Sequence, residues 1–255
     1  MRPLGPERWV ATEDRALRSA HFHRRSPSKE SVSMTVPFCA PGSNANSGHS
    51  LLFVAAIFED QPVLVDISSE IPVKHTLSSA PRRAAIDREN ATEKQAAQDA
   101  KQTATVTLFT PSGEHIISGT NKGWLNIIDM ATRQVQYSTR LTNNVIIYMR
   151  MTPMGRDIVV NSSDRIIRTL RLPDLTDPKV DVEDLRLEVE HKFQDLVQRL
   201  SWNHVSFSPT GEYVTASTWM NHHIYVWERS QGSLVKILEG PKEELSIVEV
   251  STIST

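Results

Sequence analysis

Histidine and cysteine side chains are the first candidates for chemistry in this sequence, because imidazole and thiolate groups bind transition metals. The 255-residue chain has nine histidines and one cysteine. His21, His23 and Cys39 have the ligand types of a zinc site, but no second pair of ligands lies at zinc-site spacing. His222 and His223 are adjacent at a predicted turn, where neighbouring side chains point in different directions. Solvated histidines explain this distribution better, so we predict no metal site and no cofactor.

The sequence motifs of the common catalytic sites are absent. The chain contains no G-x-S-x-G, no P-loop, no G-x-G-x-x-G and no H-E-x-x-H. Serine, histidine and aspartate all occur, but no local motif marks a nucleophile, and closeness in the sequence cannot assemble a triad. A catalytic site would have to be built from scattered loop residues. We therefore predict that the protein is not an enzyme.

Three arginines are the best candidates for contacts with a partner. Arg165, Arg168 and Arg171 surround two isoleucines, and Arg150 lies on the preceding predicted strand. Charges of one sign on a strand can meet phosphate groups or an acidic protein. They equally fit solvated residues at a strand edge, which discourage pairing with other chains. We keep Arg165, Arg168 and Arg171 as candidate contact residues and expect modest effects from their substitution.

A phrase that recurs three times indicates which elements position these residues. It reads F-T-P-S-G-E-H-I-I-S-G from Phe109, M-T-P-M-G-R-D-I-V-V-N from Met151 and F-S-P-T-G-E-Y-V-T-A-S from Phe207. In each copy an apolar residue ends a strand, Pro-x-Gly turns the chain, and a β-branched run begins the next strand. Gly113, Gly155 and Gly211 supply the positive φ of the turn. They lie 42 and 56 residues apart, and the excess fits an acidic insertion near residues 177–190. A period in the low forties is typical of a β-propeller blade.

Alternation of apolar and polar residues predicts strands in sets of up to four. The predicted ranges are 51–59, 62–68 and 73–77; 103–109, 115–120, 123–129 and 133–141; 144–151, 157–162, 165–170 and 187–193; 200–207, 213–218, 223–228 and 233–238. Each full set is a four-stranded meander, which is the unit of a propeller blade. A β-sandwich is the alternative, but it does not explain the repeated Pro-x-Gly at blade spacing. We predict an all-β fold, a partial WD-repeat β-propeller of about four blades of an expected seven.

The third strand of each set ends at a degenerate form of the Trp-Asp site of WD repeats. The four copies are Val65-Asp66, Ile128-Asp129, Thr169-Leu170 and Trp227-Glu228. Asp164 occupies the tight turn between a second and a third strand, where a carboxylate can accept backbone N–H bonds. We therefore interpret Asp129, Asp164, Trp227 and Glu228 as structural residues of the blades.

The domain organisation follows from where the alternation starts and stops. Residues 1–48 show no sustained period and are predicted to be a disordered or low-order tail. Blades are expected over residues 49–245, with insertions at 82–101 and 173–186, and a C-terminal tail at 246–255. The formal net charge of −2 argues against a globally cationic nucleic-acid binder. The longest apolar run has eight residues, too few to span a bilayer, so we predict no membrane contact.

Several stretches resemble one family closely. They are F-V-A-A-I-F-E-D-Q-P-V-L-V-D from Phe53, D-R-I-I-R from Asp164, G-E-Y-V from Gly211 and I-Y-V-W-E-R-S-Q-G-S-L-V-K-I-L from Ile224. These phrases are similar to the WD-repeat subunit of the COMPASS/MLL histone methyltransferase core, the counterpart of retinoblastoma-binding protein 5. The likeness covers roughly residues 50–245, with gaps at the two insertions. The F-E-x-Q-P-V-L-V-D and L-V-K-I-L phrases are much more specific than a generic WD repeat.

The resemblance implies a function as well as a fold. It implies a non-catalytic nuclear scaffold that joins a SET-domain methyltransferase and the other COMPASS core subunits and supports methylation of lysine 4 on histone H3. S-adenosylmethionine would belong to the catalytic partner, and the nucleosome is a further candidate partner. The alternative is a general WD-repeat adaptor of another complex, such as a ubiquitin-ligase receptor.

The resemblance also implies blades that have no counterpart in this sequence. Family members have blades before the F-E-x-Q-P phrase, and they continue after L-V-K-I-L into another blade and a segment that docks partners. Four blades of seven would leave two open sheet edges, and each lost neighbour removes interface energy from the blades that remain. We therefore expect the isolated chain to be marginally stable or prone to aggregation.

Overall fold

The computed structural model describes residues 9–14, 19–24, 33–37, 52–57, 59–82, 93–182, 185–195, 200–218 and 223–239. Over these residues the chain forms strands in four antiparallel sheets, together with the short helix α2 (Glu93–Ala100). The first sheet contains β1 (Trp9–Asp14), β2 (Ser19–Arg24), β3 (Ser33–Pro37), β4 (Leu52–Ala56), β5 (Val63–Asp66) and β6 (Val73–Thr76). The second contains β7 (Ala104–Phe109), β8 (His115–Thr120), β9 (Trp124–Asp129) and β10 (Val135–Arg140).

The third and fourth sheets repeat this four-stranded pattern. They contain β11 (Ile146–Met151), β12 (Asp157–Ser162), β13 (Ile167–Arg171) and β14 (Val189–Phe193), then β15 (Trp202–Phe207), β16 (Tyr213–Thr218), β17 (His223–Glu228) and β18 (Ser233–Glu239). Within each of these sheets every strand pairs with the next one along the chain, as in a meander. We call β3–β6, β7–β10, β11–β14 and β15–β18 the first to fourth blades.

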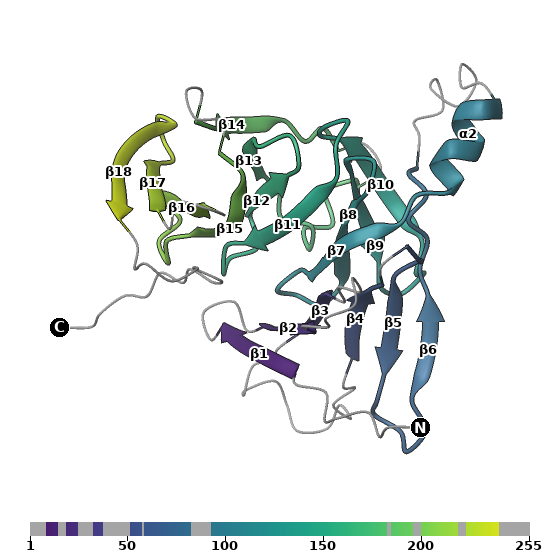
Figure 1. The fold of residues 1–255 in the computed structure, drawn as a ribbon. Coiled ribbons are helices and arrows are strands. Elements are labelled where there is room, and N and C mark those ends of the chain that lie inside the picture. The colour runs from purple at the N-terminus through teal and green to yellow at the C-terminus, as the bar shows by residue number, and fades with distance from the viewer. Residues whose placement is uncertain are drawn as a thin grey trace, which may run out of the picture.

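The four blades follow one another along an arc (Figure 1). The innermost strand of each blade packs beside that of the next, since β3 contacts β7, β7 contacts β11, and β11 contacts β15. Over the described residues, the strands of the first blade do not pack against those of the fourth, so the ring is not closed. This arrangement confirms the partial β-propeller predicted from the repeated turn.

The hydrophobic core consists of three clusters, each lying between two neighbouring blades. The cluster between the second and third blades includes Ile127, Met149 and Val160, all with no exposed surface. A second cluster joins the third and fourth blades through aromatic residues such as Trp202 and Trp227. The remaining cluster, from Val54 to Ile128, joins the first and second blades. Because burial of apolar surface is the main favourable term in folding, each blade is stabilised chiefly by its neighbours.

The first sheet differs from the prediction of a disordered or low-order tail over residues 1–48. Residues 33–37 form β3, which pairs with β4, and β2 and β1 extend the same sheet beyond β3. The physical reason is that, without β3, one edge of the largely buried strand β4 would have backbone N–H and C=O groups with no hydrogen-bonding partners. The sequence carries no signal for these three strands, because each is short and shows no sustained alternation.

The acidic insertion between β13 and β14 also contributes to packing. The apolar side chains of Leu175, Leu185 and Leu187 pack against the cluster between the second and third blades, which Tyr137 also borders. The backbone N–H of Leu187 donates a hydrogen bond to the Tyr137 hydroxyl at 3.2 Å. The segment therefore fastens the third blade onto β10, the outer strand of the second.

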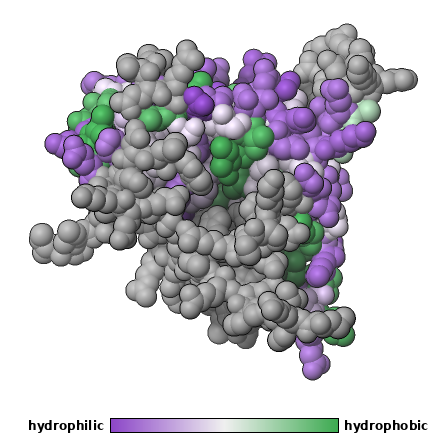
Figure 2. All heavy atoms as spheres, viewed as in Figure 1, coloured by the Kyte–Doolittle hydropathy of each residue, from purple (hydrophilic) through white to green (hydrophobic). Residues whose placement is uncertain are grey.

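Among the described residues, no segment packs over the outer strand β18 of the fourth blade in this way. All seven of its residues are exposed, including the apolar Leu234, Val235, Ile237 and Leu238. Figure 2 shows hydrophobic surface at the upper left, the region where Figure 1 places β18. Apolar surface of this kind on an outer strand is the feature that makes a sheet edge prone to association.

The three repeated turns share one hydrogen-bonding pattern. In each, a hydroxyl accepts the backbone N–H five residues later, at 3.2 Å for Thr110 and Thr152 and 3.0 Å for Ser208. The glycines Gly113, Gly155 and Gly211 have φ of +75°, +72° and +76°. We call the surface formed by the turns 110–114, 152–156 and 208–212 the Pro-Gly face.

Gly155→Ala should destabilise the chain more than Gly113→Ala. Both substitutions place a side chain at positive φ, which costs about 1–2 kcal/mol. A Cβ at Gly155 would also lie 2.6 Å from Cδ of Pro111 in the preceding blade, whereas at Gly113 it would meet nothing within 4 Å. We expect Gly155→Ala to cost a further ~1–3 kcal/mol in urea unfolding because the proline ring is rigid. Equal urea midpoints for the two variants would show that the turn at Gly155 does not pack closely against Pro111.

Candidate interaction surface and the network that shapes it

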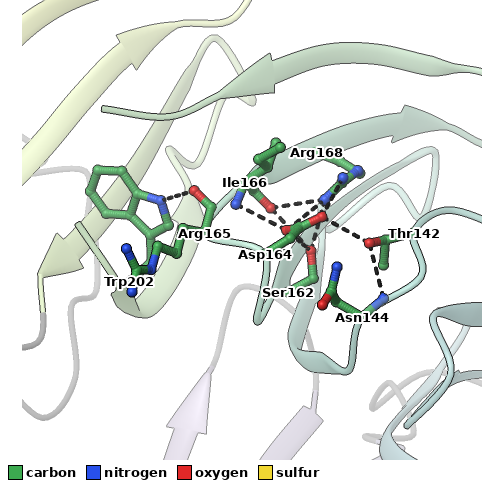
Figure 3. Close-up of polar contacts among 8 residues, drawn as sticks. All are labelled: Thr142, Asn144, Ser162, Asp164, Arg165, Ile166, Arg168 and Trp202. Carbon is green, nitrogen blue, oxygen red and sulfur yellow. Dashed lines mark hydrogen bonds and ion pairs between the residues drawn. The ribbon is translucent and has the colours of Figure 1, made fainter. Parts of the chain in front are cut away.

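A network centred on Asp164 shapes the end of the third blade opposite the Pro-Gly face (Figure 3). The Asp164 carboxylate accepts hydrogen bonds from the hydroxyls of Thr142, at 2.8 Å, and Ser162, at 2.7 Å. Arg168 donates two more, at 3.1 and 2.6 Å, and the backbone N–H of Ile166 donates another at 3.1 Å. The network joins the β10–β11 connection to the β12–β13 turn. We call the surface formed by residues 141–145 and 163–166 the Asp164 face.

The hydrogen bonds within this network decide the charge of Asp164. Burial alone would raise the pKa of its carboxyl group. Hydrogen bonds from Arg168, Ser162, Thr142 and the Ile166 N–H outweigh burial and lower the pKa from 3.8 to about 2. Asp164 is therefore ionised throughout the physiological pH range. Its negative charge balances the positive charge of Arg168, which is buried with 5% of its surface exposed.

The turn that follows Asp164 presents Arg165 in an unusual conformation. Arg165 has φ of +67° and is exposed, and its carbonyl accepts a hydrogen bond from the indole N–H of Trp202 at 2.9 Å. Left-handed backbone is unfavourable for a residue with a side chain and persists where the surroundings fix it. Here the Asp164 network fixes one end of the turn, and the fourth blade, through Trp202, fixes the other.

The structure separates the three arginines that the sequence grouped together. Arg168 is buried and paired with Asp164, so the structure gives it a contact within the third blade, and its role toward a partner stays a prediction. Arg165 lies on the Asp164 face, before β13 begins. Arg171 ends β13 on the Pro-Gly face, beside Asp157, and its side chain is 69% exposed. A single basic patch therefore does not form, and Arg165 and Arg171 remain as candidates on opposite faces.

Sequence reasoning missed two residues that position the Asp164 face. Gly123 has φ of +78°, and a Cβ there would lie 2.2 Å from the carbonyl oxygen of Thr142. This close approach brings Thr142 within reach of Asp164. Thr142 itself follows a predicted strand and belongs to no motif, so only the Gly-containing turn between the strands at 115–120 and 124–129 could have signalled the contact.

A second polar cluster, also missed from the sequence, joins the third and fourth blades at the Pro-Gly face. Arg229 donates to Asp157 at 2.6 Å and to Glu190 at 2.7 and 2.8 Å. The side chain of Arg229 is 8% exposed, and its guanidinium lies 5.6 Å from the Phe207 ring centroid. Burial opposes ionisation of Asp157, but hydrogen bonds and charge from Arg229, and secondarily from Arg171, lower its pKa.

The remaining blade-signature residues lie where strands end. Asp129 accepts hydrogen bonds from the backbone N–H and hydroxyl of Thr132, both at 2.6 Å. Trp227 is 4% exposed in the cluster between the third and fourth blades. Glu228 accepts a hydrogen bond from the Ser230 hydroxyl at 2.6 Å. These contacts involve local turns and the core rather than a shared surface.

The histidines considered for metal binding are not brought together in the part of the chain that the structure describes. His21 and His23 lie on β2, His223 begins β17, and Cys39 and His222 fall outside the described residues. Among the described residues, no group of three or more histidine, cysteine, aspartate or glutamate side chains could hold a metal ion. Within the same residues, no helix has the length and apolar character needed to cross a membrane.

Comparison with known proteins gives three informative relatives. The Set1 complex component Swd1 of Schizosaccharomyces pombe is 46% identical over 198 residues, covering 77% of this chain and 46% of the relative. The COMPASS component SWD1 of Saccharomyces cerevisiae is 33% identical over 200 residues, covering 76% and 44%. The retinoblastoma-binding protein 5 homolog of Drosophila melanogaster is 34% identical over 145 residues, covering 55% and 29%. No family model matches the chain.

A solved structure decides the family. The β-propeller domain of Cps50 (Swd1) from Myceliophteria thermophila aligns with a TM-score of 0.71 and 41% sequence identity, covering 92% of this chain and 74% of that chain. The chain belongs to the Swd1 and retinoblastoma-binding protein 5 family. This Swd1-family chain spans about half the length of the curated relatives it matches, 46% and 44% for the two yeast proteins.

Asp164→Asn should destabilise this Swd1-family chain by about 2–4 kcal/mol, because it leaves the buried Arg168 without its counter-charge. Urea unfolding at neutral pH measures the effect. Asp174→Asn is the control, since Asp174 accepts the N–H and hydroxyl of Thr176 but is exposed, and the charge of Arg156 is the smallest influence on its pKa. The control should change stability little.

The pH dependence of unfolding tests the charge of Asp164 directly. Because its folded pKa is lowered from 3.8 to about 2, the carboxylate stabilises the fold fully above pH 4, and this contribution is lost as the pH falls toward 2. Asp164→Asn should remove that part of the acid-unfolding slope. An unchanged slope would mean that Asp164 does not carry the charge that pairs with Arg168.

Arg229→Met should cost about 2–4 kcal/mol, because Asp157 and Glu190 would face each other beside the buried site with only Arg171 nearby. Arg171→Met is the control on the same carboxylate. Its exposed side chain and longer, 3.3 Å contact predict a change within about 0.5 kcal/mol. Thermal unfolding of both variants measures the difference, and similar costs would contradict the distinction between the two arginines.

Proposed function

We propose that this chain is a non-catalytic scaffold subunit of a COMPASS-type histone H3 lysine 4 methyltransferase complex. The observation that carries the proposal is the likeness to named complex components, at 46% identity to the Swd1 of Schizosaccharomyces pombe and 41% to the Cps50 propeller. In this role the chain binds the SET-domain subunit and the other core subunits, works in the nucleus, and brings the catalytic subunit to the nucleosome. S-adenosylmethionine is bound by the catalytic partner.

The geometry supports binding rather than chemistry. Two polar clusters hold arginines against carboxylates: Asp164 with Arg168 within the third blade, and Arg229 with Asp157 and Glu190 between the third and fourth blades. The pKa values of Asp157 and Asp164 are lowered by their arginine partners, in contrast to the raised pKa that a general acid needs. Rigid surfaces of this kind lower the entropy lost when a partner binds.

We assign the Asp164 face to partner docking. Arg165 is exposed there on a turn whose backbone is held by Asp164 on one side and by Trp202 on the other, so the backbone that carries Arg165 is already ordered when a partner binds. Arginine side chains at protein interfaces are frequent sites of large binding loss on truncation. Arg171 lies on the opposite, Pro-Gly face beside Asp157 and serves as the control.

The test is co-expression of the chain with the SET-domain subunit and core partners, followed by size exclusion and a histone methylation assay. We expect co-elution and methylation above that of the partners alone. Arg165→Ala should weaken association about tenfold, equivalent to ~1.4 kcal/mol, and Arg171→Ala less than twofold. Both variants should retain the wild-type unfolding midpoint, which separates lost binding from lost folding.

The other outcomes have distinct meanings. Co-elution without raised methylation would keep the scaffold but remove its activating role. A folded chain that fails to co-elute would overturn the proposal and favour an adaptor of another complex. A larger effect of Arg171→Ala than of Arg165→Ala would move the docking surface to the Pro-Gly face.

A further inference from the structure

The inner edge of the first blade is occupied in a way that the other blades do not share. In the first sheet the order is β1-β2-β3-β4-β5-β6, so β3 has β4 on one side and β2 on the other. In the second, third and fourth sheets the innermost strands β7, β11 and β15 are edge strands over the described residues. Figure 1 shows β1 and β2 extending from β3 away from β4–β6. An antiparallel strand has thus been added to the edge that a propeller blade turns toward its axis.

The added hairpin and the strand that accepts it are anchored very differently. β3 pairs with β4, whose Val54, Ala55 and Ala56 are buried, and it also contacts β7 of the second blade. The main strand contacts of β2 are with β3 and β1, and those of β1 are with β2. A two-stranded hairpin is marginally stable on its own in water. The hairpin therefore depends on one row of backbone hydrogen bonds to β3, whereas β3 does not depend on the hairpin to the same extent.

We propose that the inner edge of β3 is a strand-acceptor site for an extended segment of a partner protein, and that β2 occupies this site until the partner replaces it. Strand addition of this kind draws its affinity from backbone hydrogen bonds and its selectivity from alternate side chains. The inference is independent of the proposed complex, since it concerns an edge that any chain with a suitable segment can use.

The register of β2 against β3 indicates which residues a replacing segment needs. Phe22 of β2 lies opposite Met34, and Ala20 lies opposite Val36. In this register a segment that replaces β2 in kind offers a small residue opposite Val36 and an aromatic residue opposite Met34, two positions apart. Pro37, at the end of β3, lacks an N–H and limits the ladder there. The site therefore selects an extended segment of about five residues with the pattern small-x-aromatic, running antiparallel to β3.

The first experiment compares the full chain with its Ala20→Pro/Phe22→Pro variant by hydrogen exchange and peptide binding. β2 lies between β1 and β3, and proline within such a central strand removes ladder hydrogen bonds and prevents regular pairing, so the backbone amides of β3 should exchange faster in the variant while those of β8 and β12 stay protected. A fluorescein-labelled peptide of residues 18–25 should bind the variant saturably and restore protection to β3. The wild-type chain should bind this peptide at least tenfold more weakly, because its own β2 competes within the same molecule.

The control variant Ala20→Thr/Phe22→Tyr keeps the backbone donors and should behave as the wild type, and a scrambled peptide should bind neither chain. Equal exchange of β3 in wild type and proline variant, with β8 and β12 protected, would overturn the pairing. Faster exchange of β3 without binding of the peptide would overturn the acceptor site.

A disulfide lock decides the matter if the proline variant fails to fold. In a Cys39→Ser background, Ala20→Cys/Val36→Cys and His21→Cys/Thr35→Cys place cysteines at directly opposed positions, whereas Ser19→Cys/Ser33→Cys places them at opposite ends of the ladder. At least one opposed pair should oxidise, and the distant pair should not. At high peptide concentration only the reduced form should bind. Peptide binding to the disulfide-bonded chain, or no oxidation of either opposed pair, would contradict the proposal.

Discussion

A propeller blade can bury its faces only against the neighbouring blades, and this requirement governs the rest of the structure. The apolar residues form clusters between the first and second, second and third, and third and fourth blades. Within one blade the strands contribute backbone hydrogen bonds, but the hydrophobic stabilisation arises between blades. Every feature that fixes one blade relative to the next therefore acts on the main source of stability.

The polar networks follow from the same requirement. Apolar packing is non-directional, so it holds two sheets together without fixing their rotation. Hydrogen bonds and ion pairs supply the missing direction, with the Trp202–Arg165 bond at the Asp164 face and the Arg229 cluster at the Pro-Gly face. Between them, the Tyr148 hydroxyl lies 2.7 Å from Nε2 of His204. Three directional contacts along one interface define how the fourth blade sits on the third, and with it the surface offered to a partner.

The parts of the structure that sequence reasoning predicted are those encoded locally. Strands such as residues 115–120, 157–162 and 213–218 have the predicted bounds, because alternation and the Pro-x-Gly turn depend on neighbours in the chain. The Arg229 cluster could not be predicted, since Asp157 and Glu190 lie 72 and 39 residues away in the sequence. The ion pair of Arg168 could have been predicted locally, because Asp164 four residues earlier offers a counter-charge across a tight turn.

Two sheet edges of the arc, β18 and the inner edge of β3, are protected from pairing with other chains in different ways. β18 ends the fourth blade with four exposed apolar side chains and one lysine, Lys236, a residue type that discourages pairing between edges. The inner edge of β3 has no charged residue, and here a strand of the chain itself satisfies the backbone groups. The lysine opposes edge pairing only in part, because four apolar residues of β18 remain exposed beside it, whereas a paired strand covers the edge of β3 while it stays bound. The second device leaves the edge able to accept another strand whenever the paired strand dissociates.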